Sequence, residues 1–233
     1  MSTPPRPQWV PWLEAAAVVA AAALLTLLVL RLAQSFHSLA SLLPAICAAL
    51  AGYLLADLVT GTVHWFCDTF FAEDTPLIGP LLIAPFREHH RDPLAMTRHS
   101  FLELTGNSCL ALLPALALAL WIGPSPAAPA AAPVYSFILA LALAAAATNL
   151  FHRWAHDPAP PKFARTLQRL GLILSAEHHA QHHAPPHRTA YCVTNGWANR
   201  VADRLGVFAR AERVFISCSK GLVNYRHATR LLR

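Results

Sequence analysis

Eleven of the thirteen histidines fall into two blocks of the sequence, residues 64–99 and 152–187. His152 and His156 lie four residues apart, which places both imidazoles on one face of a helix, one turn from each other. His178 and His182 repeat this spacing, as do His179 and His183. The repeat predicts four imidazoles on adjacent stripes of one short helix. We predict that ten of these histidines bind metal: His64, His89, His90, His152, His156, His178, His179, His182, His183 and His187.

The number of ligands decides which metal chemistry the pattern favours. Neutral imidazole suits iron, zinc, copper and nickel. A zinc hydrolase would use three protein ligands with a carboxylate base such as Glu88 or Glu177, and most of the histidines would then have no role. A mixed site that includes Cys67 is an alternative, but imidazoles are far more plentiful nearby. Two non-haem irons that react with O2 would use the whole set, so we predict a di-iron centre with no separate catalytic residue.

Polar residues beside the predicted ligands are candidates to support them. Metal-bound imidazoles usually donate their second N–H to a carboxylate or a carbonyl. An ordinary solvated charge is the alternative interpretation of each residue, and His99 could equally bind a metal or a headgroup. The candidates within a few positions of a histidine are His99, Asp68, Glu88, Asp92, Glu103, Asp157 and Glu177.

Four apolar stretches must position the two histidine blocks. They are rich in Ala and Leu, which are strong helix formers, and each has close to the roughly 20 residues that cross a bilayer as a helix. Only 13% of all residues are charged, against about 25% in soluble domains. The predicted spans are residues 13–30, 39–60, 104–122 and 134–151.

The distribution of basic residues predicts the orientation of the spans. Four spans place both termini and the loop at 61–103 on one side of the membrane, together with seventeen of the eighteen Lys and Arg residues. Arg31 alone lies on the other side. Basic residues accumulate in the cytoplasm, so we expect both termini and the histidine blocks to be cytoplasmic.

The basic tail and the apolar composition bear on possible partners. Residues 200–233 interleave basic and apolar side chains, as in an interfacial helix on anionic headgroups, although a solvated tail fits as well. The topology accounts for the net charge of +6, which therefore does not indicate nucleic-acid binding.

A metal transporter would carry ionisable residues in mid-membrane, whereas Glu14 and Asp57 lie near span ends. No iron–sulfur or C-x-x-C-H haem motif is present, so electrons must come from an external donor.

The order and spacing of several motifs resemble one known family. The motifs are His64-Trp…Asp68, Pro85-Phe-Arg-Glu-His-His…Asp92-Pro, Thr97-Arg-His…Phe…Glu103, Asn107, His152-Arg-Trp-Ala-His156 and His178-His-Ala-Gln-His-His…Pro186-His…Tyr191-Cys-Val-Thr…Gly196-Trp-Ala-Asn199. Over roughly residues 57–199 they look like the plasmanylethanolamine desaturase family, the Kua/CarF-type lipid desaturases. The resemblance adds Asn107 to the candidate supporting residues.

The resemblance implies a reaction. A member of this family would convert a 1-O-alkyl ether phospholipid to the 1-O-alk-1′-enyl form, a plasmalogen, with two iron ions, O2 and an external electron donor that is cytochrome b5-like or ferredoxin-like. A plant branch desaturates an acyl chain of phosphatidylglycerol instead, and the motifs do not separate the two substrates. An acyl-lipid desaturase or hydroxylase therefore remains the alternative, with a metal-binding or transport protein behind it.

Together these observations predict an all-α protein. We expect a multi-pass integral membrane bundle of about four transmembrane helices with a cytosolic, histidine-rich helical cap, in a single lipid desaturase domain over residues 1–233. Its expected segments are two N-terminal spans at 1–60, the first histidine block at 61–103, two more spans at 104–151, the second histidine block at 152–199 and the basic tail at 200–233.

Overall fold

The computed structural model describes residues 7–219, so His227 and the end of the basic tail lie outside the described residues. Within that range every regular element is a helix, which confirms the all-α prediction. The α-helices are α1 Val10–Ala33, α2 Leu42–Thr69, α3 Ala84–Arg91, α4 Ala95–Arg98, α5 Phe101–Ile122, α6 Ala131–His156, α7 Lys162–Arg169, α8 Ala176–His179, α9 Trp197–Arg204 and α10 Val207–Ser219. A 3-10 helix, η1 Leu39–Ser41, precedes α2, and a π-helix, η2 Gly79–Ile83, precedes α3.

The four predicted spans are confirmed as helices long and apolar enough to cross a membrane. Their ends differ from the prediction in one useful way. Helix α2 continues past residue 60 to Thr69, and α6 continues past residue 151 to His156. The first histidines of both blocks therefore lie on regular extensions of the spanning helices, which fixes the direction of their side chains.

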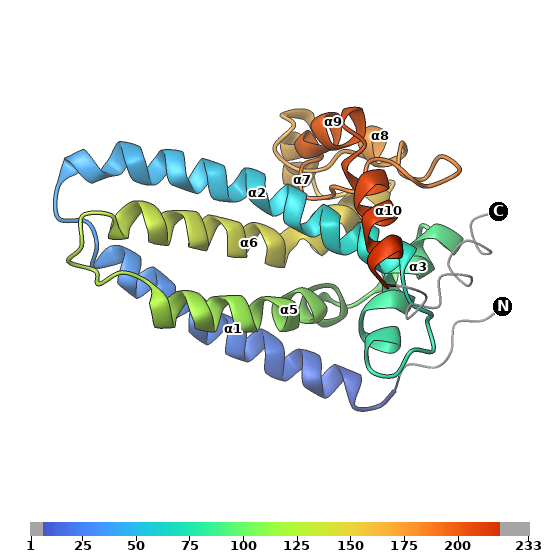
Figure 1. Ribbon diagram of the computed structural model, residues 1–233, viewed down its shortest axis with the longest axis horizontal. Coiled ribbons are helices and arrows are strands. Elements are labelled where there is room, and N and C mark those ends of the chain that lie inside the picture. Colours follow the sequence, from blue (N-terminus) through green and yellow to red (C-terminus); the bar gives the residue numbers. More distant parts are fainter. Residues whose placement is uncertain (1–6, 220–233) are drawn as a thin grey trace. The chain divides into compact units, whose positions relative to one another are not determined.

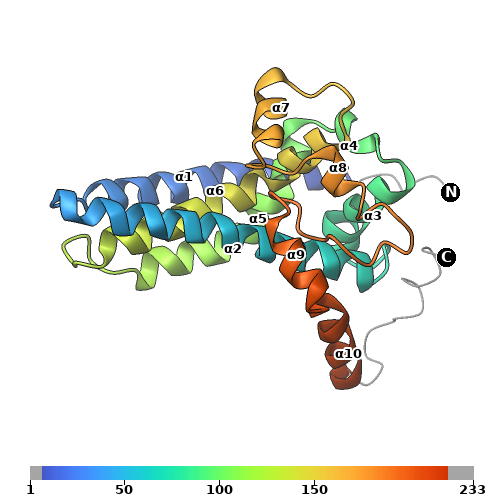
Figure 2. The ribbon, with the colours of Figure 1, turned by 90° about the horizontal axis from the view of Figure 1, so that it is seen from above.

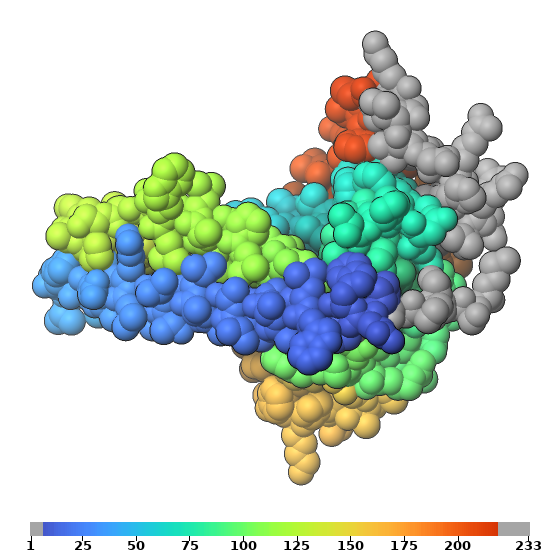
Figure 3. Space-filling view, turned by 90° about the horizontal axis from the view of Figure 1, so that it is seen from below, coloured from blue at the N-terminus to red at the C-terminus, as the bar shows by residue number. Residues whose placement is uncertain are grey.

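One compact unit, residues 11–56 and 100–149, holds the apolar parts of the four long helices. We call it the bundle unit. Figure 1 shows α1, α2, α5 and α6 running side by side in it, and Figure 3 shows α1 in blue lying along α5 in yellow-green. Small residues such as Ala17 and Ala142 are buried in its core, while Val19 and Leu43 are each 70% exposed. Small residues inside and large apolar residues outside are typical of helices packed in lipid.

A glycine sets how closely two of these helices pack. A Cβ atom on Gly52 of α2 would lie 2.2 Å from the carbonyl oxygen of Phe137 on α6. No side chain fits at that distance, so the backbones of α2 and α6 touch here. Close contact between backbones is how small residues bring helices together in membranes.

The second compact unit contains residues 57–99 and 150–219, with residues 7–10. We call it the histidine unit. Figure 2 shows the short helices α3, α4, α7, α8 and α9 gathered around the last turns of α2 and α6. Its core includes aromatic side chains from the end of α2, from the loop before α9 and from α10, among them Trp65, Phe70, Tyr191 and Phe208.

Asp57, at the start of this unit, holds the segment that leads into α9. Its carboxylate is fully buried and accepts hydrogen bonds from four backbone N–H groups. Oδ1 accepts from Thr194, Asn195 and Gly196 at 2.9–3.0 Å, and Oδ2 accepts from Ala198 at 2.9 Å. A carboxylate here satisfies free N–H groups at a helix N-terminus, where negative charge is also favoured.

Arg87, on α3, binds free carbonyl groups at the C-terminal end of α2. The guanidinium is buried and donates to the carbonyls of Cys67, Phe70 and Phe71 at 2.9–3.1 Å. The last carbonyls of a helix have no partner within the helix, and a cation is favoured there. This contact fixes α3 against the end of α2.

Candidate metal centre

Four elements supply the histidines of the candidate metal centre. His64 comes from α2, the adjacent pair His89 and His90 from α3, and the pair His152 and His156 from one face of α6. The sequence predicted a single short helix for the four histidines from 178 to 183. Helix α8 instead ends at His179, and a turn follows in which the N–H groups of residues 182 and 183 both donate to the His179 carbonyl.

The structure brings nine of the ten predicted ligands into groups that could hold metal. In each group, one ligand atom from every residue lies within 4.8 Å of all the others. The five-histidine group is His89, His152, His156, His179 and His183. The four-histidine group is His64, His89, His90 and His182. A third, partly exposed group is His90, His183 and His187.

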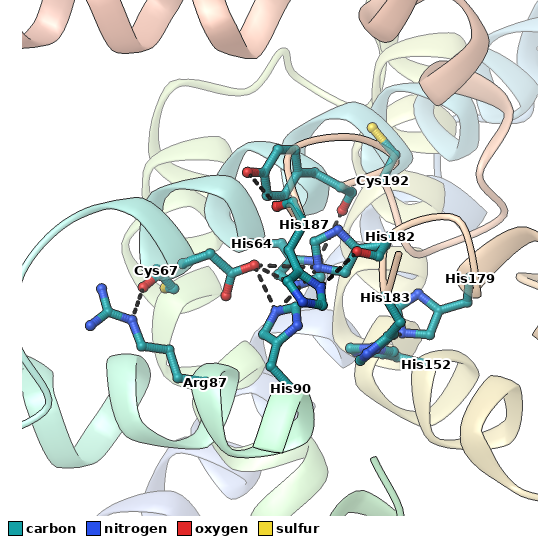
Figure 4. Close-up of polar contacts among 12 residues, drawn as sticks. His64, Cys67, Arg87, His90, His152, His179, His182, His183, His187 and Cys192 are labelled. Atoms are coloured by element: carbon teal, nitrogen blue, oxygen red, sulfur yellow. Dashed lines mark hydrogen bonds and ion pairs between the residues drawn. The ribbon is translucent and has the colours of Figure 1, made fainter. Parts of the chain in front are cut away.

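The five-histidine group converges on the ring of His179. Its Nε2 lies 2.8 Å from His152 Nε2 and 3.0 Å from His183 Nε2, two of the side chains labelled in Figure 4. His156 Nε2 lies 2.9 Å from the same atom. A neutral imidazole nitrogen either donates one hydrogen or offers one lone pair. Hydrogen bonds alone therefore cannot satisfy three such contacts at one atom, whereas one cation would accept all four lone pairs.

Burial keeps the histidines of this group in the form that binds metal. Burial, reinforced by the neighbouring His152, lowers the pKa of His89 well below its usual value. Burial is also the main cause that lowers the pKa of His179 and His183, with His156 the next cause in both. These rings are neutral at neutral pH, and neutral imidazole is the metal ligand.

In the four-histidine group, two backbone carbonyls set the orientation of the rings. His64 Nδ1 lies 3.1 Å from the carbonyl oxygen of Tyr191, and His182 Nδ1 lies 2.8 Å from that of Thr189. A carbonyl can only accept, so each Nδ1 carries a hydrogen, and in the neutral form of the ring Nε2 then offers its lone pair. This is the usual arrangement of histidines that bind metal through Nε2.

His89 links the two groups. It is 1% exposed and belongs to both of them. Its Nε2 is buried without a hydrogen-bond partner, which is costly unless another partner is supplied. The donor set therefore suits metal binding, and the two histidine groups meet at His89.

His178 is the predicted ligand that the structure does not bring to these groups. Its Nε2 lies 3.1 Å from the side-chain nitrogen of Asn199 on α9. Gly196 has φ +80°, and a Cβ there would lie 2.8 Å from His178 Nε2. His178 thus packs on the start of α9, which explains a glycine at that position.

Among the candidate supporting residues, Asp68 contacts the predicted ligands directly. Its Oδ2 lies 3.2 Å from His64 Nε2, 3.0 Å from His90 Nε2 and 3.4 Å from His182 Nε2. The four residues come from α2, α3 and the turn after α8. A single carboxylate oxygen therefore joins histidines from both blocks of the sequence.

The other candidates have different surroundings. Glu88 pairs with His99 at 3.4 Å, and Asp92 pairs with Arg98. Glu103 forms a capping box with Ser100 at the start of α5, while Asp157 accepts from the N–H of Ala159. Asn107 is buried on α5, and Glu177 is exposed in the first turn of α8.

Sequence reasoning missed three contributors to the centre. Arg87 was counted only as a basic loop residue, although it lies two positions before His89 and aligns α3. The carbonyls of Tyr191 and Thr189 were not foreseen, because a backbone acceptor leaves no trace in residue type. The available signal for Arg87 was a cation in a largely apolar segment beside the ligands.

The apolar helices and the buried histidines define the class of protein: a multi-pass helical membrane protein with a histidine cluster suited to metal. Comparison with known proteins gives the family. The lipid desaturase domain matches residues 53–223, and the chain belongs to this family. It is accordingly an oxidoreductase, a desaturase of membrane lipid.

Individual relatives agree with the family. The chain is 42% identical to a plasmanylethanolamine desaturase of Myxococcus xanthus, over 91% of this chain and 73% of that protein. It is 37% identical to plasmanylethanolamine desaturase 1 of Mus musculus, over 72% of this chain and 63% of the mouse protein. It is 36% identical to the chloroplastic fatty acid desaturase 4 of Arabidopsis thaliana, over 82% of this chain and 58% of the plant protein. The alignments thus span less than two thirds of the mouse and plant proteins, and no solved structure gives a significant match.

Proposed function

We propose that the chain is a di-iron desaturase that converts plasmanylethanolamine to a plasmalogen with O2 and electrons from an external donor. The observation that carries the proposal is the pair of histidine groups that share His89. Ether-lipid desaturation is the activity named for the Myxococcus and mouse relatives. When bound, two iron ions would supply the activation of O2 and the electron transfer that desaturation needs.

The residues of the chain prepare the site in two ways. Backbone carbonyls hold the rings of His64 and His182 with Nε2 free. Burial of His89, His152 and His179 keeps water from the ligand atoms, and exclusion of water protects a reactive site from side reactions. Both features are set by the fold around the rings, so little reorganisation is needed during the reaction.

The substrate is the part of the proposal that needs a second candidate. The Arabidopsis relative is named a fatty acid desaturase, which implies an acyl chain as its substrate. The same histidine groups could act on either lipid, because desaturation of an alkyl or an acyl chain removes two hydrogens from adjacent carbons. We favour the ether lipid because the most similar of the three relatives described above carries that name.

The electron donor and its side of the membrane follow from charge. We propose that a cytochrome b5-like or ferredoxin-like carrier docks on the basic, cytoplasmic side, where seventeen of the eighteen Lys and Arg residues are expected. Complementary charge speeds encounter between partners, and salt weakens it. Raising the salt concentration should therefore slow reduction of the enzyme by an acidic carrier. An unchanged rate would contradict this mode of docking.

One experiment tests the function. Purified protein is incubated with alkyl-ether or diacyl phospholipid, O2 and a reducing system, and the lipids are analysed by mass spectrometry. We expect loss of two mass units from the ether lipid and an acid-labile vinyl ether product. Loss of two mass units from the diacyl lipid alone would select the acyl desaturase instead.

Variants connect the activity to the histidine groups. His179→Ala and His183→Ala should each lower bound iron and activity by about 100-fold or more, because each removes a ligand from the five-histidine group. His37→Ala is the matched control, since His37 is exposed and contacts the carbonyl of Pro126 at 3.0 Å. Full activity in either ligand variant would mean that the reaction does not use this site.

A further inference from the structure

We propose that a surface formed by α7, the loop that follows it and α9 rests on the anionic headgroups of the bilayer that the chain spans. We call it the interfacial surface. It contains none of the clustered histidines, so its role is separate from the proposed function. The sequence suggested an interfacial helix only in the tail at residues 200–233, whereas this surface begins at α7. Its apolar side chains, all exposed, are Phe163, Leu170, Leu172, Trp197, Val201 and Leu205.

Helix α9 presents three of these side chains in one row. Trp197, Val201 and Leu205 follow one another at intervals of four residues, so they lie on the same face of the helix. Each is more than half exposed. The other face is buried through Asn199 and Ala202, so the helix is already packed on one side. An apolar row left on the exposed side marks a surface for a further partner.

The loop after α7 lies beside the start of this row. A Cβ atom on Gly171 would be 3.7 Å from Nε1 of Trp197, so the loop and the indole are in contact. The N–H of Leu174 donates to the carbonyl of Thr194 at 3.0 Å and holds the loop there. The two residues that flank Gly171 are exposed leucines. The apolar side chains of the loop and of α9 therefore belong to one region of the histidine unit.

Contacts with the end of α6 indicate the depth of this region. The ring of Phe163 packs edge-on against Trp154 of α6 at a centroid distance of 5.2 Å, and Gln168 donates to the carbonyl of Trp154 at 3.2 Å. Trp154 follows the predicted end of the fourth span at residue 151 by three residues, or about 5 Å along a helix. The headgroup layer extends about 5–7 Å beyond the apolar core of a bilayer. Helix α7 thus packs on α6 at the depth expected for headgroups.

The charges of α7 and α9 favour an anionic lipid as the partner. The single carboxylate of the two helices, Asp203, accepts from the backbone N–H of Ala190 at 3.1–3.3 Å and so faces the protein. Basic residues together with exposed apolar ones are typical of helices that bind anionic membrane surfaces. The headgroup depth favours lipid over a soluble partner. The basic residues of the two helices, all exposed, are Lys162, Arg165, Arg169, Arg200 and Arg204.

The test attaches a fluorescent label to single cysteines of the full-length protein in nanodiscs. Cys47→Ser and Cys218→Ser remove the two exposed thiols, and the other three cysteines are buried. The label is placed by Val201→Cys or by Leu170→Cys. Thr189→Cys is the matched control, since Thr189 is exposed in the same unit but outside the interfacial surface.

The discs contain phosphatidylcholine alone or with phosphatidylglycerol, and the quenchers are a doxyl-labelled lipid in the bilayer and iodide in the water. In discs with phosphatidylglycerol, we expect the doxyl lipid to quench labels at 201 and 170, iodide to quench them weakly, and the label at 189 to show the reverse. Quenching of both surface labels by iodide alone would overturn the proposal.

The contribution of charge is tested separately. Arg200→Gln combined with Arg204→Gln should weaken docking on phosphatidylglycerol about 25-fold, since each arginine near an anionic surface contributes about fivefold. The label at 170 should then become accessible to iodide. Equal doxyl quenching with and without phosphatidylglycerol, unchanged in the arginine variant, would refute an anionic lipid as the partner.

Other occupants of the surface would give different results. Shielding of both labels from both quenchers only in discs that hold two chains would indicate a second copy, and shielding that requires an added acidic electron carrier would indicate a docking site for that protein. Either result would overturn the proposal. If Val201→Cys fails to fold, Leu170→Cys carries the test, because the two positions lie on different elements.

Discussion

The bundle unit and the histidine unit share two helices but bury different chemistry along them. In the bundle unit, α2 buries Ala45 and Ala56. In the histidine unit, the same helix buries Asp57, His64 and Asp68. Along one continuous helix, the buried side chains therefore change from small apolar residues to carboxylates and a clustered histidine, and the change begins between Ala56 and Asp57.

The difference shows that the two units are stabilised in different ways. A helix satisfies most of its backbone hydrogen bonds internally, as a bilayer requires, and the bundle core combines alanines with a few large side chains such as Leu28 and Tyr135. The histidine unit contains loops whose backbone groups need partners from elsewhere, and buried charges supply them. Asp57 serves the segment before α9, and Arg87 serves the end of α2.

The largest expected effect is the loss of Asp57. Asp57→Ala would leave four backbone N–H groups without their acceptor, at a cost of about 6 kcal/mol or more, since hydrogen bonds to charged groups contribute about 1.5–3 kcal/mol each. We expect the segment at 194–198 to exchange its amide hydrogens rapidly and bound iron to fall, while α5 stays protected. Hydrogen exchange measured by mass spectrometry would check this.

Asp57→Asn is the control for this prediction. It keeps one oxygen, which can still accept part of the set that Oδ1 binds, so its effect should be smaller than that of Ala. Equal protection of 194–198 in all three proteins would show that the four contacts do not stabilise the histidine unit.

The second effect concerns the alignment of α3. Arg87→Met should lower stability by about 4–5 kcal/mol, because three carbonyls at the end of α2 lose a charged donor and each such hydrogen bond contributes at least about 1.5 kcal/mol. His89 and His90 follow on the same helix, so iron content should fall as well. Arg91→Met, whose arginine lies one turn later and pairs with Glu73, should bind iron normally; equal iron content in both variants would contradict the role assigned to Arg87.

The sequence predicts features that depend on neighbouring residues, and it does not predict contacts between residues that are far apart in the chain. The spans were predictable because hydropathy and helical period are local properties, and so was the i, i+4 spacing of His152 and His156. The contact from Asp57 to Thr194 joins residues 137 positions apart, and no local pattern indicates it. The place of His178 was not predictable for the same reason: its partner Asn199 lies on another helix.

The third effect tests the bundle unit by itself. Gly52→Val should destabilise the packing of α2 on α6 by about 2 kcal/mol, since overpacking costs about 1–3 kcal/mol and the new Cβ would meet the Phe137 carbonyl. The neighbouring Ala51 is exposed, so Ala51→Val is the matched control. Thermal unfolding in detergent should show a lower midpoint for Gly52→Val alone; equal midpoints would mean that the helices do not touch here.

The smallest effect is a dependence on pH that only the histidine unit should show. In the metal-free protein, burial lowers the pKa of His89 and His179 well below 6.5, whereas both rings take up protons in the unfolded chain near their ordinary value. The unfolded state then binds more protons, so stability falls as the pH drops through 6.5 and is nearly constant above it. Each ring contributes about 0.7 kcal/mol between pH 7 and pH 6.

The two units provide the internal control for this prediction. The bundle unit has one histidine, His37, which is exposed, so its amide exchange should change little over the same range. We expect protection in residues 176–183 to decrease between pH 7 and pH 6, after correction for the intrinsic exchange rate, while protection in residues 110–120 is retained. A parallel decrease in both segments would show that acid acts on the whole chain. Unchanged protection at 176–183 would show that these imidazoles take up protons as readily in the folded protein as in the unfolded chain.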